Sequence, residues 1–87
     1  FVGKIGERLR FPAFIKDVKF IAKYNIHLVT CLTKENNIIK FFFNREPDIQ
    51  GLIEGKDVIL TGKVKTHDIS KFSNCKETVF NYVRIEQ

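Results

Sequence analysis

Aromatic and basic side chains stand close together at several places in this 87-residue chain. Lys40 and Phe42 flank a single residue in IIKFFFN, and Lys71 and Phe72 are adjacent in HDISKFSNCK. Aromatic rings stack on nucleobases, each stack contributing about 1–3 kcal/mol, while lysines meet the phosphates of the same strand. This chemistry predicts binding of single-stranded nucleic acid. The candidate binding residues are Tyr24, Lys40, Phe42, Lys63, Lys65, Lys71, Phe72 and Lys76.

Within IIKFFFN, the polar Lys40 marks the outward-facing positions of a strand. Because side chains alternate between the two faces, we expect Phe42 outside with Lys40, and Ile39, Phe41 and Phe43 in the core. If the opening segment of the chain covers Phe42 instead, its ring serves only packing.

The other candidates also have structural alternatives. Phe72 has no periodic apolar partner in its polar loop, which favours a ligand contact, although such a ring can also hold the loop against the domain. Phe80 and Tyr82 can form a second exposed aromatic pair or a contact surface for another domain. Lys63 and Lys65 can follow a phosphate backbone or simply solubilise a strand.

The charge of the chain agrees with a polyanionic partner. Its net charge is +5, with basic residues spread over the whole length, although a lysine-rich solubilising surface would have the same composition. The sequence has no Gly-x-Ser-x-Gly, no P-loop, no His-Glu-x-x-His and no carboxylate pair spaced for acid–base work. We therefore expect a binding protein and not an enzyme.

The cysteines and histidines predict no cofactor. His27 with Cys31, and His67 with Cys75, are not recognised spacings for zinc ligands, and the two cysteines are too few for a disulfide scaffold. No secretory leader is visible, and no apolar run approaches the ~20 residues of a membrane span. We expect a cytoplasmic protein with no metal and no membrane partner.

The elements that position these side chains read as strands. Residues 13–24, AFIKDVKFIAKY, carry apolar side chains of both parities, which favours a long, bent and bulged strand over the competing helical spacing. Residues 26–33 and 38–44 flank KENN, where Asn36 or Asn37 can adopt a left-handed conformation, so they predict an antiparallel hairpin. Asp48, after Pro47, can cap one helical turn beyond it. 

Residues 54–68, EGKDVILTGKVKTHD, contain a glycine inside an alternating apolar pattern. Gly62 predicts a corner, since a strand in a small barrel bends sharply or approaches its neighbour where no side chain fits. Strands are expected over about 56–66 and over 76–86. The predicted inward residues of these strands are Val58, Leu60, Val64, Val79, Val83 and Ile85.

These elements predict an all-β fold, a five-stranded antiparallel Greek-key barrel with a short helical turn or loop between the third and fourth strands. The segments VGKIGERL, KYN, EGKD and KETVFNYVRI resemble those of OB-fold (oligonucleotide/oligosaccharide-binding) domains, especially small OB-like domains of phage- and plasmid-encoded proteins that handle DNA. The resemblance implies a ligand face on strands two and three, flanked by the loops after strands one and four. The crossover is shorter than the helix that many OB domains place there.

Together, the resemblance and the candidate residues predict a sequence-tolerant module for single-stranded nucleic acid, with DNA favoured over RNA. The chain lacks methionine and starts at Phe1, so residues 1–87 are interpreted as one domain of a longer replication, transfer or recombination protein of a mobile element. The alternative is a protein-interaction or structural OB domain that docks on a neighbouring domain of its parent. Lysines clustered around exposed aromatic rings would favour the first.

Overall fold

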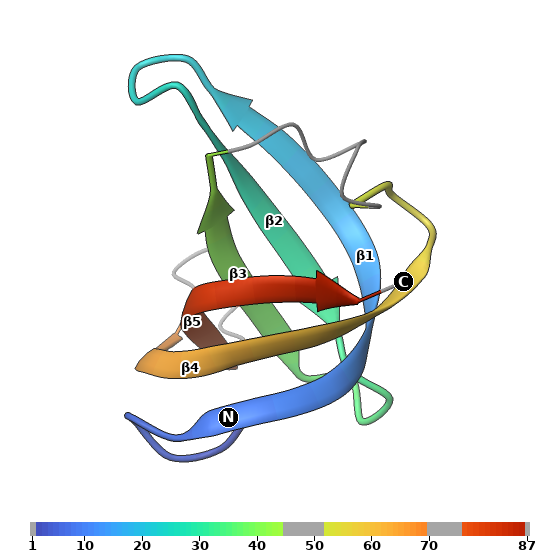
Figure 1. The fold of residues 1–87 in the computed structure, drawn as a ribbon, viewed down its shortest axis with the longest axis vertical. Coiled ribbons are helices and arrows are strands. Elements are labelled where there is room, and N and C mark those ends of the chain that lie inside the picture. The colour runs from blue at the N-terminus through green and yellow to red at the C-terminus, as the bar shows by residue number, and fades with distance from the viewer. Residues whose placement is uncertain (1, 45–51, 70–75, 87) are drawn as a thin grey trace.

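The computed structural model describes residues 2–44, 52–69 and 76–86, which form five strands. They are β1 (Arg8–Ile21), β2 (Ile26–Leu32), β3 (Ile38–Phe43), β4 (Asp57–Ile69) and β5 (Lys76–Glu86). The strands close into a barrel in the order β1-β2-β3-β5-β4, with β4 returning to β1 (Figure 1). In these described ranges, no helical segment has the length and apolar character of a membrane span.

β1 is a long strand shared by both halves of the barrel. Its first half, up to Phe14, pairs with β4, and its second half pairs with β2. A register shift between Ile15 and Asp17 marks the bulge at which the strand changes neighbours. The prediction of a bent, bulged strand is therefore confirmed. The strand starts earlier than expected, at Arg8, and includes Pro12, whose fixed φ is compatible with extended backbone.

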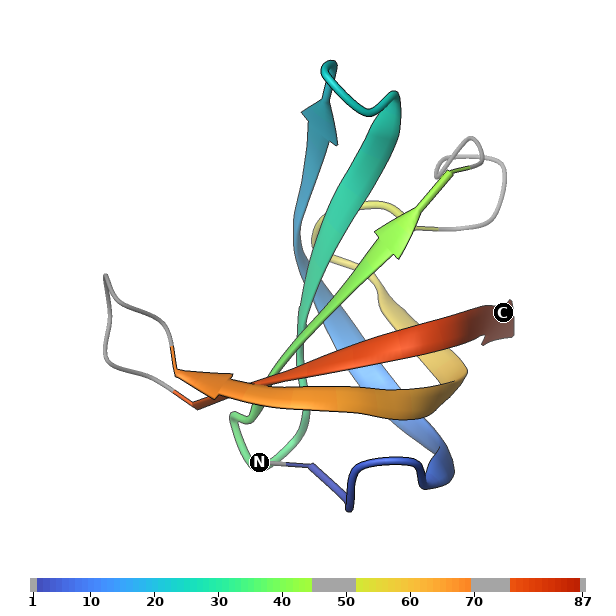
Figure 2. The same ribbon diagram turned by 90° about the vertical axis from the view of Figure 1, so that its left-hand side faces the viewer.

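The β1–β2 hairpin extends beyond the rest of the barrel at one end, while β4 and β5 cross below it in the view of Figure 2.

Asparagines take the left-handed conformation in both of the first two turns: φ is 52° at Asn25 and 63° at Asn36. Asn36 thus fulfils the turn prediction for KENN. The paired residues of β2 and β3 form the expected antiparallel hairpin.

The sheet is mixed, which corrects the expectation of a purely antiparallel barrel. β3 and β5 run parallel over residues 38–41 and 77–80, whereas the other neighbouring pairs are antiparallel. Strand direction cannot alternate completely around a closed ring with an odd number of strands, so at least one pair must be parallel.

The crossover between β3 and β4 shows no helical turn in its described part. Residues 52–56 contain a turn in which the Lys56 amide donates to the Ile53 carbonyl at 3.1 Å. The predicted turn capped by Asp48 after Pro47 falls outside the described residues. β4 also extends to Ile69, beyond the predicted end at Thr66, because it stays paired with β5.

The core lies inside the barrel. Ile39, Phe41 and Phe43 are buried while Phe42 is 54% exposed, as predicted. The predicted core positions Val58, Leu60 and Val64 are buried as well.

The inward face of β5 differs from the prediction in its first half. Thr78 and Phe80 are buried there, and Val79 lies between them with its side chain on the other face. In the second half, Val83 and Ile85 pack on the core while remaining partly exposed, as their predicted parity requires. The inward parity therefore switches within the strand.

Candidate nucleic-acid interface

A bulge in β5 causes this switch. Asn81 pairs with Lys63, and the next paired residue of β5, Arg84, pairs with Thr61. Two residues of β5 thus lie between these pairs but only one residue of β4, so β5 holds one extra residue. Tyr82, inside the bulge, has a φ of 53°. Left-handed backbone is unusual for a bulky residue and is found where the surrounding structure holds it. The bulge leaves the Tyr82 side chain 72% exposed on the outside of the barrel.

Gly62 supports the bulge from β4. A Cβ at this position would lie 3.0 Å from Cδ2 of Phe80, 3.2 Å from Cγ2 of Val83 and 3.3 Å from the carbonyl oxygen of Asn81. β5 therefore packs closely against β4 at this glycine, which is one of the two reasons, with a sharp corner, that the sequence indicates for it. A side chain here would require Phe80, Val83 or the Asn81 carbonyl to shift by a few tenths of an ångström.

A groove opens beside the bulge, because β3 and β5 separate after their last paired residues, Phe41 and Phe80. Its volume is about 570 Å³. The exposed rings of Phe42 and Tyr82 line it from β3 and β5, and Arg84 adds a guanidinium from β5. The remaining lining residues are Ile26, Phe43, Asn44 and Val83. The groove thus combines aromatic surface with a cation.

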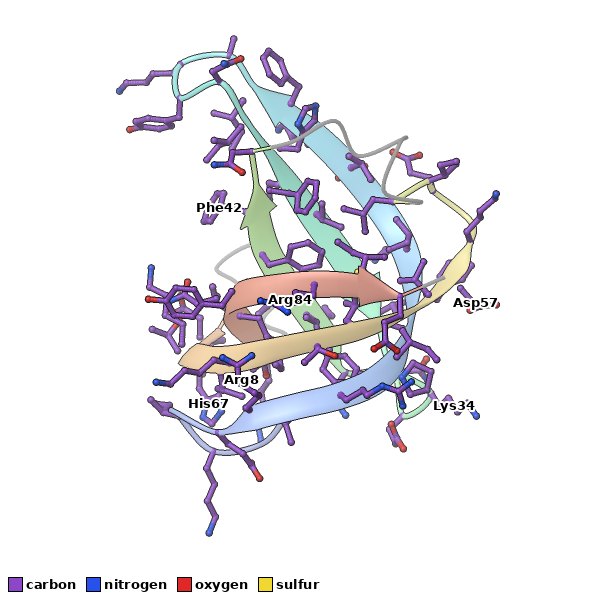
Figure 3. All side chains as sticks on the ribbon, viewed as in Figure 1. Arg8, Lys34, Phe42, Asp57, His67 and Arg84 are labelled. Carbon is purple, nitrogen blue, oxygen red and sulfur yellow. The ribbon has the colours of Figure 1, made fainter. Side chains whose placement is uncertain are left out.

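Exposed cations continue from the groove across β4 to β1. Arg8 lies directly opposite Lys63, and Arg84 pairs with Thr61 on the other side of β4. Figure 3 shows Arg8 and Arg84 on either side of β4. Lys65 is also exposed, further along β4. We call Arg8, Lys63, Lys65 and Arg84 the basic row.

No ion pair joins the basic row to a carboxylate within the described parts of the chain. Like charges directly opposite each other on neighbouring strands repel, and the exposed Arg8 and Lys63 occupy such a pair of positions. A bound anion would relieve that repulsion. The row therefore has the electrostatic character of a phosphate-binding surface.

Other cations near this face are already neutralised. Lys40 forms a 2.8 Å ion pair with Glu77, whose side chain is only 12% exposed. Arg10 forms a 2.7 Å ion pair with Glu86, and the hydrogen bonds to Glu86 raise the pKa of the guanidinium. These cations hold strands together and have less capacity for a phosphate.

The predicted binding residues divide into groups. Phe42 lies in the groove, and Lys63 and Lys65 belong to the basic row. Tyr24 lies in the β1–β2 turn, 63% exposed, with the Lys23 ammonium 5.4 Å from its ring centroid.

Lys76 begins β5 and is exposed. Lys71 and Phe72 fall outside the described residues. Phe80, considered as an exposed partner of Tyr82, is instead buried and packs its ring 5.3 Å from that of Phe11. The bulge explains the difference, because Phe80 precedes it and faces the core, whereas Tyr82 and Arg84 face outward.

Arg8 and Arg84 were missed as binding residues, and Tyr82 was considered only as an aromatic patch. The segment NYVRIE does contain a signal for Arg84: an aromatic and a basic residue that flank one apolar residue, like Phe42 and Lys40. Arg8 carries no comparable local signal, because its place opposite Lys63 depends on pairing between distant segments.

The described residues contain no group of three or more His, Cys, Asp and Glu side chains that could hold a metal ion. Cys31 is fully buried in the core, and this burial raises its pKa to about 12. A thiol in that state is protonated and inaccessible, so it is neither a nucleophile nor a metal ligand.

The closed five-stranded barrel is compatible with an OB-like fold. Comparisons of the chain with family models, with curated proteins and with solved structures gave no match. The interpretation of the groove and the basic row therefore depends on their own geometry and charge.

Proposed function

We propose that this domain is an OB-like module that binds single-stranded nucleic acid, DNA in preference to RNA, largely independently of sequence. It would serve a larger protein of replication, transfer or recombination. The observation that carries the proposal is the groove itself: Tyr82 is held exposed by a left-handed bulge, across from the exposed Phe42. The preference for DNA follows from the resemblance to DNA-handling OB-like domains.

In this proposal the strand passes over β5, from the groove to the basic row. Bases stack on Phe42 and Tyr82. The phosphates meet the four cations of the basic row, Arg84, Lys63, Lys65 and Arg8. Stacking tolerates any base because every base has a π-face, and the electrostatic contribution depends on phosphates alone. Arg84 belongs to both the groove and the row, so it connects the stacked bases to the phosphate path.

The uncompensated charge supports this function over the alternative of docking on a neighbouring domain. Exposed rings alone would suit an apolar partner, but the repulsion between Arg8 and Lys63 is relieved by an anion and not by an apolar surface. A partner protein would need an acidic face to achieve the same effect. A flexible polyanion satisfies both the rings and the cations.

The proposal is tested by fluorescence anisotropy with a labelled thymidine oligonucleotide at low salt. Phe42→Ala and Tyr82→Ala should each weaken binding about 5- to 150-fold, corresponding to one lost stack of about 1–3 kcal/mol. Phe20→Ala is the matched control, because Phe20 is 52% exposed but contacts His27 on the β1–β2 hairpin, outside the groove. Equal losses in all three variants, or none in the first two, would argue against the groove.

A further inference from the structure

The groove between β3 and β5 carries hydrogen-bonding chemistry in addition to its aromatic walls. Arg84 and Asn44 both line it. Arg84 has no carboxylate partner among the described residues, so its donors remain available to a ligand. A guanidinium presents five N–H donors in a planar fork and no acceptor. It therefore selects a base edge that offers adjacent acceptors.

Guanine fits this fork best. It presents N7 and O6 as adjacent acceptors, whereas the corresponding edge of adenine pairs an acceptor with a donor, and thymine offers only O4 beside a methyl group. Cytosine has adjacent acceptors in O2 and N3, but its single ring covers less of the two aromatic walls. The two-ring face of guanine makes the larger stacking contact with Phe42 and Tyr82.

Asn44 is the competing group, because a side-chain amide pairs with N6 and N7 of adenine. It is exposed at the end of β3, next to the groove. A bidentate bond from a charged guanidinium is stronger than bonds from a neutral amide. Arg84 should therefore decide the preference.

The backbone that carries one wall of the groove is set before binding. The left-handed bulge defines where β5 presents Tyr82, and the bulge packs against Gly62. A preformed site loses less conformational freedom when a ligand enters, so a small difference in hydrogen bonding remains measurable in the affinity.

From these features we infer that the groove binds one guanine base of a single strand, stacked against Phe42 and Tyr82, with Arg84 donating to N7 and O6. The inference rests on the proposed function and adds a base preference at a single position. The rest of the interface stays tolerant of sequence.

The test compares heptamers of thymidine in which the central base is thymine, guanine, adenine or cytosine, by fluorescence anisotropy at one low salt concentration. Heptamers are short enough that few binding registers compete with the central one. The guanine heptamer should bind about fivefold or more tightly than the thymine heptamer. Arg84→Lys, which keeps the charge but removes the fork, should abolish that preference, measured within the variant as the ratio of its affinities for the guanine and thymine heptamers.

Arg10→Lys is the matched control, because Arg10 is paired with Glu86 and lies outside the groove. It should leave both the affinity and the guanine preference unchanged, and circular-dichroism melting should show all variants folded. Tight binding of every heptamer with equal affinity, or a preference for adenine or cytosine, would overturn the inference while the proposed function stands. A guanine preference that survives in Arg84→Lys would overturn the role of Arg84. No binding of any heptamer would remove the proposed function as well.

Discussion

Replacing Tyr82 by glycine and by alanine separates the backbone of the bulge from the ring that it presents. Both substitutions remove the ring. Only glycine adopts a φ of 53° without steric cost, whereas alanine retains the unfavourable contact between Cβ and the backbone. The pair therefore reports whether the chain holds this left-handed conformation in solution, independently of what the ring binds.

The expected difference in stability follows from opposing contributions. Left-handed backbone costs a non-glycine residue roughly 1–2 kcal/mol. Glycine loses about 0.5–1 kcal/mol more than alanine in conformational entropy on folding. Tyr82 is 72% exposed, so the loss of its packing is small and equal in both variants. Tyr82→Gly should therefore be more stable than Tyr82→Ala by up to about 1.5 kcal/mol, with a midpoint of about 0.75 kcal/mol, the reverse of the usual order in a strand.

Thermal melting followed by circular dichroism measures this difference. About 1 kcal/mol moves the melting temperature of a domain this size by about 4–8 °C, so the glycine variant should melt a few degrees above the alanine variant. Both variants should lose oligonucleotide affinity to a similar extent, about 5- to 150-fold, because both lack the stacking ring. If Tyr82→Ala is instead more stable than Tyr82→Gly by about 0.5–1 kcal/mol, as is usual in a strand, the bulge is not left-handed at this residue, and the explanation of the groove's wall is wrong.

Three further predictions concern the glycine, the thiol and the cations. Gly62→Ala should cost about 1–3 kcal/mol, measured by urea denaturation, because its Cβ would lie 3.0 Å from the nearest ring carbon; an unchanged midpoint would contradict the packing described. In a Cys75→Ser background, Cys31 should resist a disulfide reagent at pH 8 until the protein unfolds, since burial raises its pKa to about 12; rapid labelling of the native protein would refute the burial. Because that pKa is raised from 9.0, the contribution of the buried thiol to folding stability is complete below pH 9 and is lost as the pH rises toward 12. Lys63→Ala should reduce the salt dependence of oligonucleotide binding by about 0.7 log units per log unit of salt. Lys40→Ala should barely change that dependence, because the Lys40 ammonium is already ion-paired with Glu77. Equal reductions in the two variants would show that the ion pair does not matter for binding.

Much of the fold was predictable from local patterns. The apolar residues of both parities in residues 13–24 indicated a strand with two neighbours, and β1 has them. Gly62 indicated a corner or a close approach, of which the structure shows the close approach, and Phe42 indicated an exposed ring, because each depends on a short stretch of alternating residues. Asn36 indicated a turn for the same kind of reason, a residue type matched to a backbone conformation.

What depends on non-local structure was not predictable. Inward and outward side chains were expected to alternate without interruption through KETVFNYVRIE. The extra residue at the Tyr82 bulge breaks this alternation, so that even-numbered residues face inward before it and odd-numbered residues after it. Tyrosine gives no signal of a left-handed residue, since its intrinsic preference is for extended backbone. The pairing of Arg8 with Lys63 depends on the register in which β4 closes the barrel, and the groove depends on where β3 and β5 separate. Neither the pairing nor the groove can be recognised from the local sequence.

The salt dependence of binding to a single-stranded thymidine oligonucleotide tests the central claim most directly. If the phosphates meet the four cations of the basic row, the plot of log affinity against log salt concentration should have a slope of about −3, from about 0.7 per contact. Anisotropy titrations at several salt concentrations measure it, with a duplex of the same length as the comparison. Saturable binding to the single strand with that slope would support the account. No binding at low salt, or a slope near zero, would contradict it.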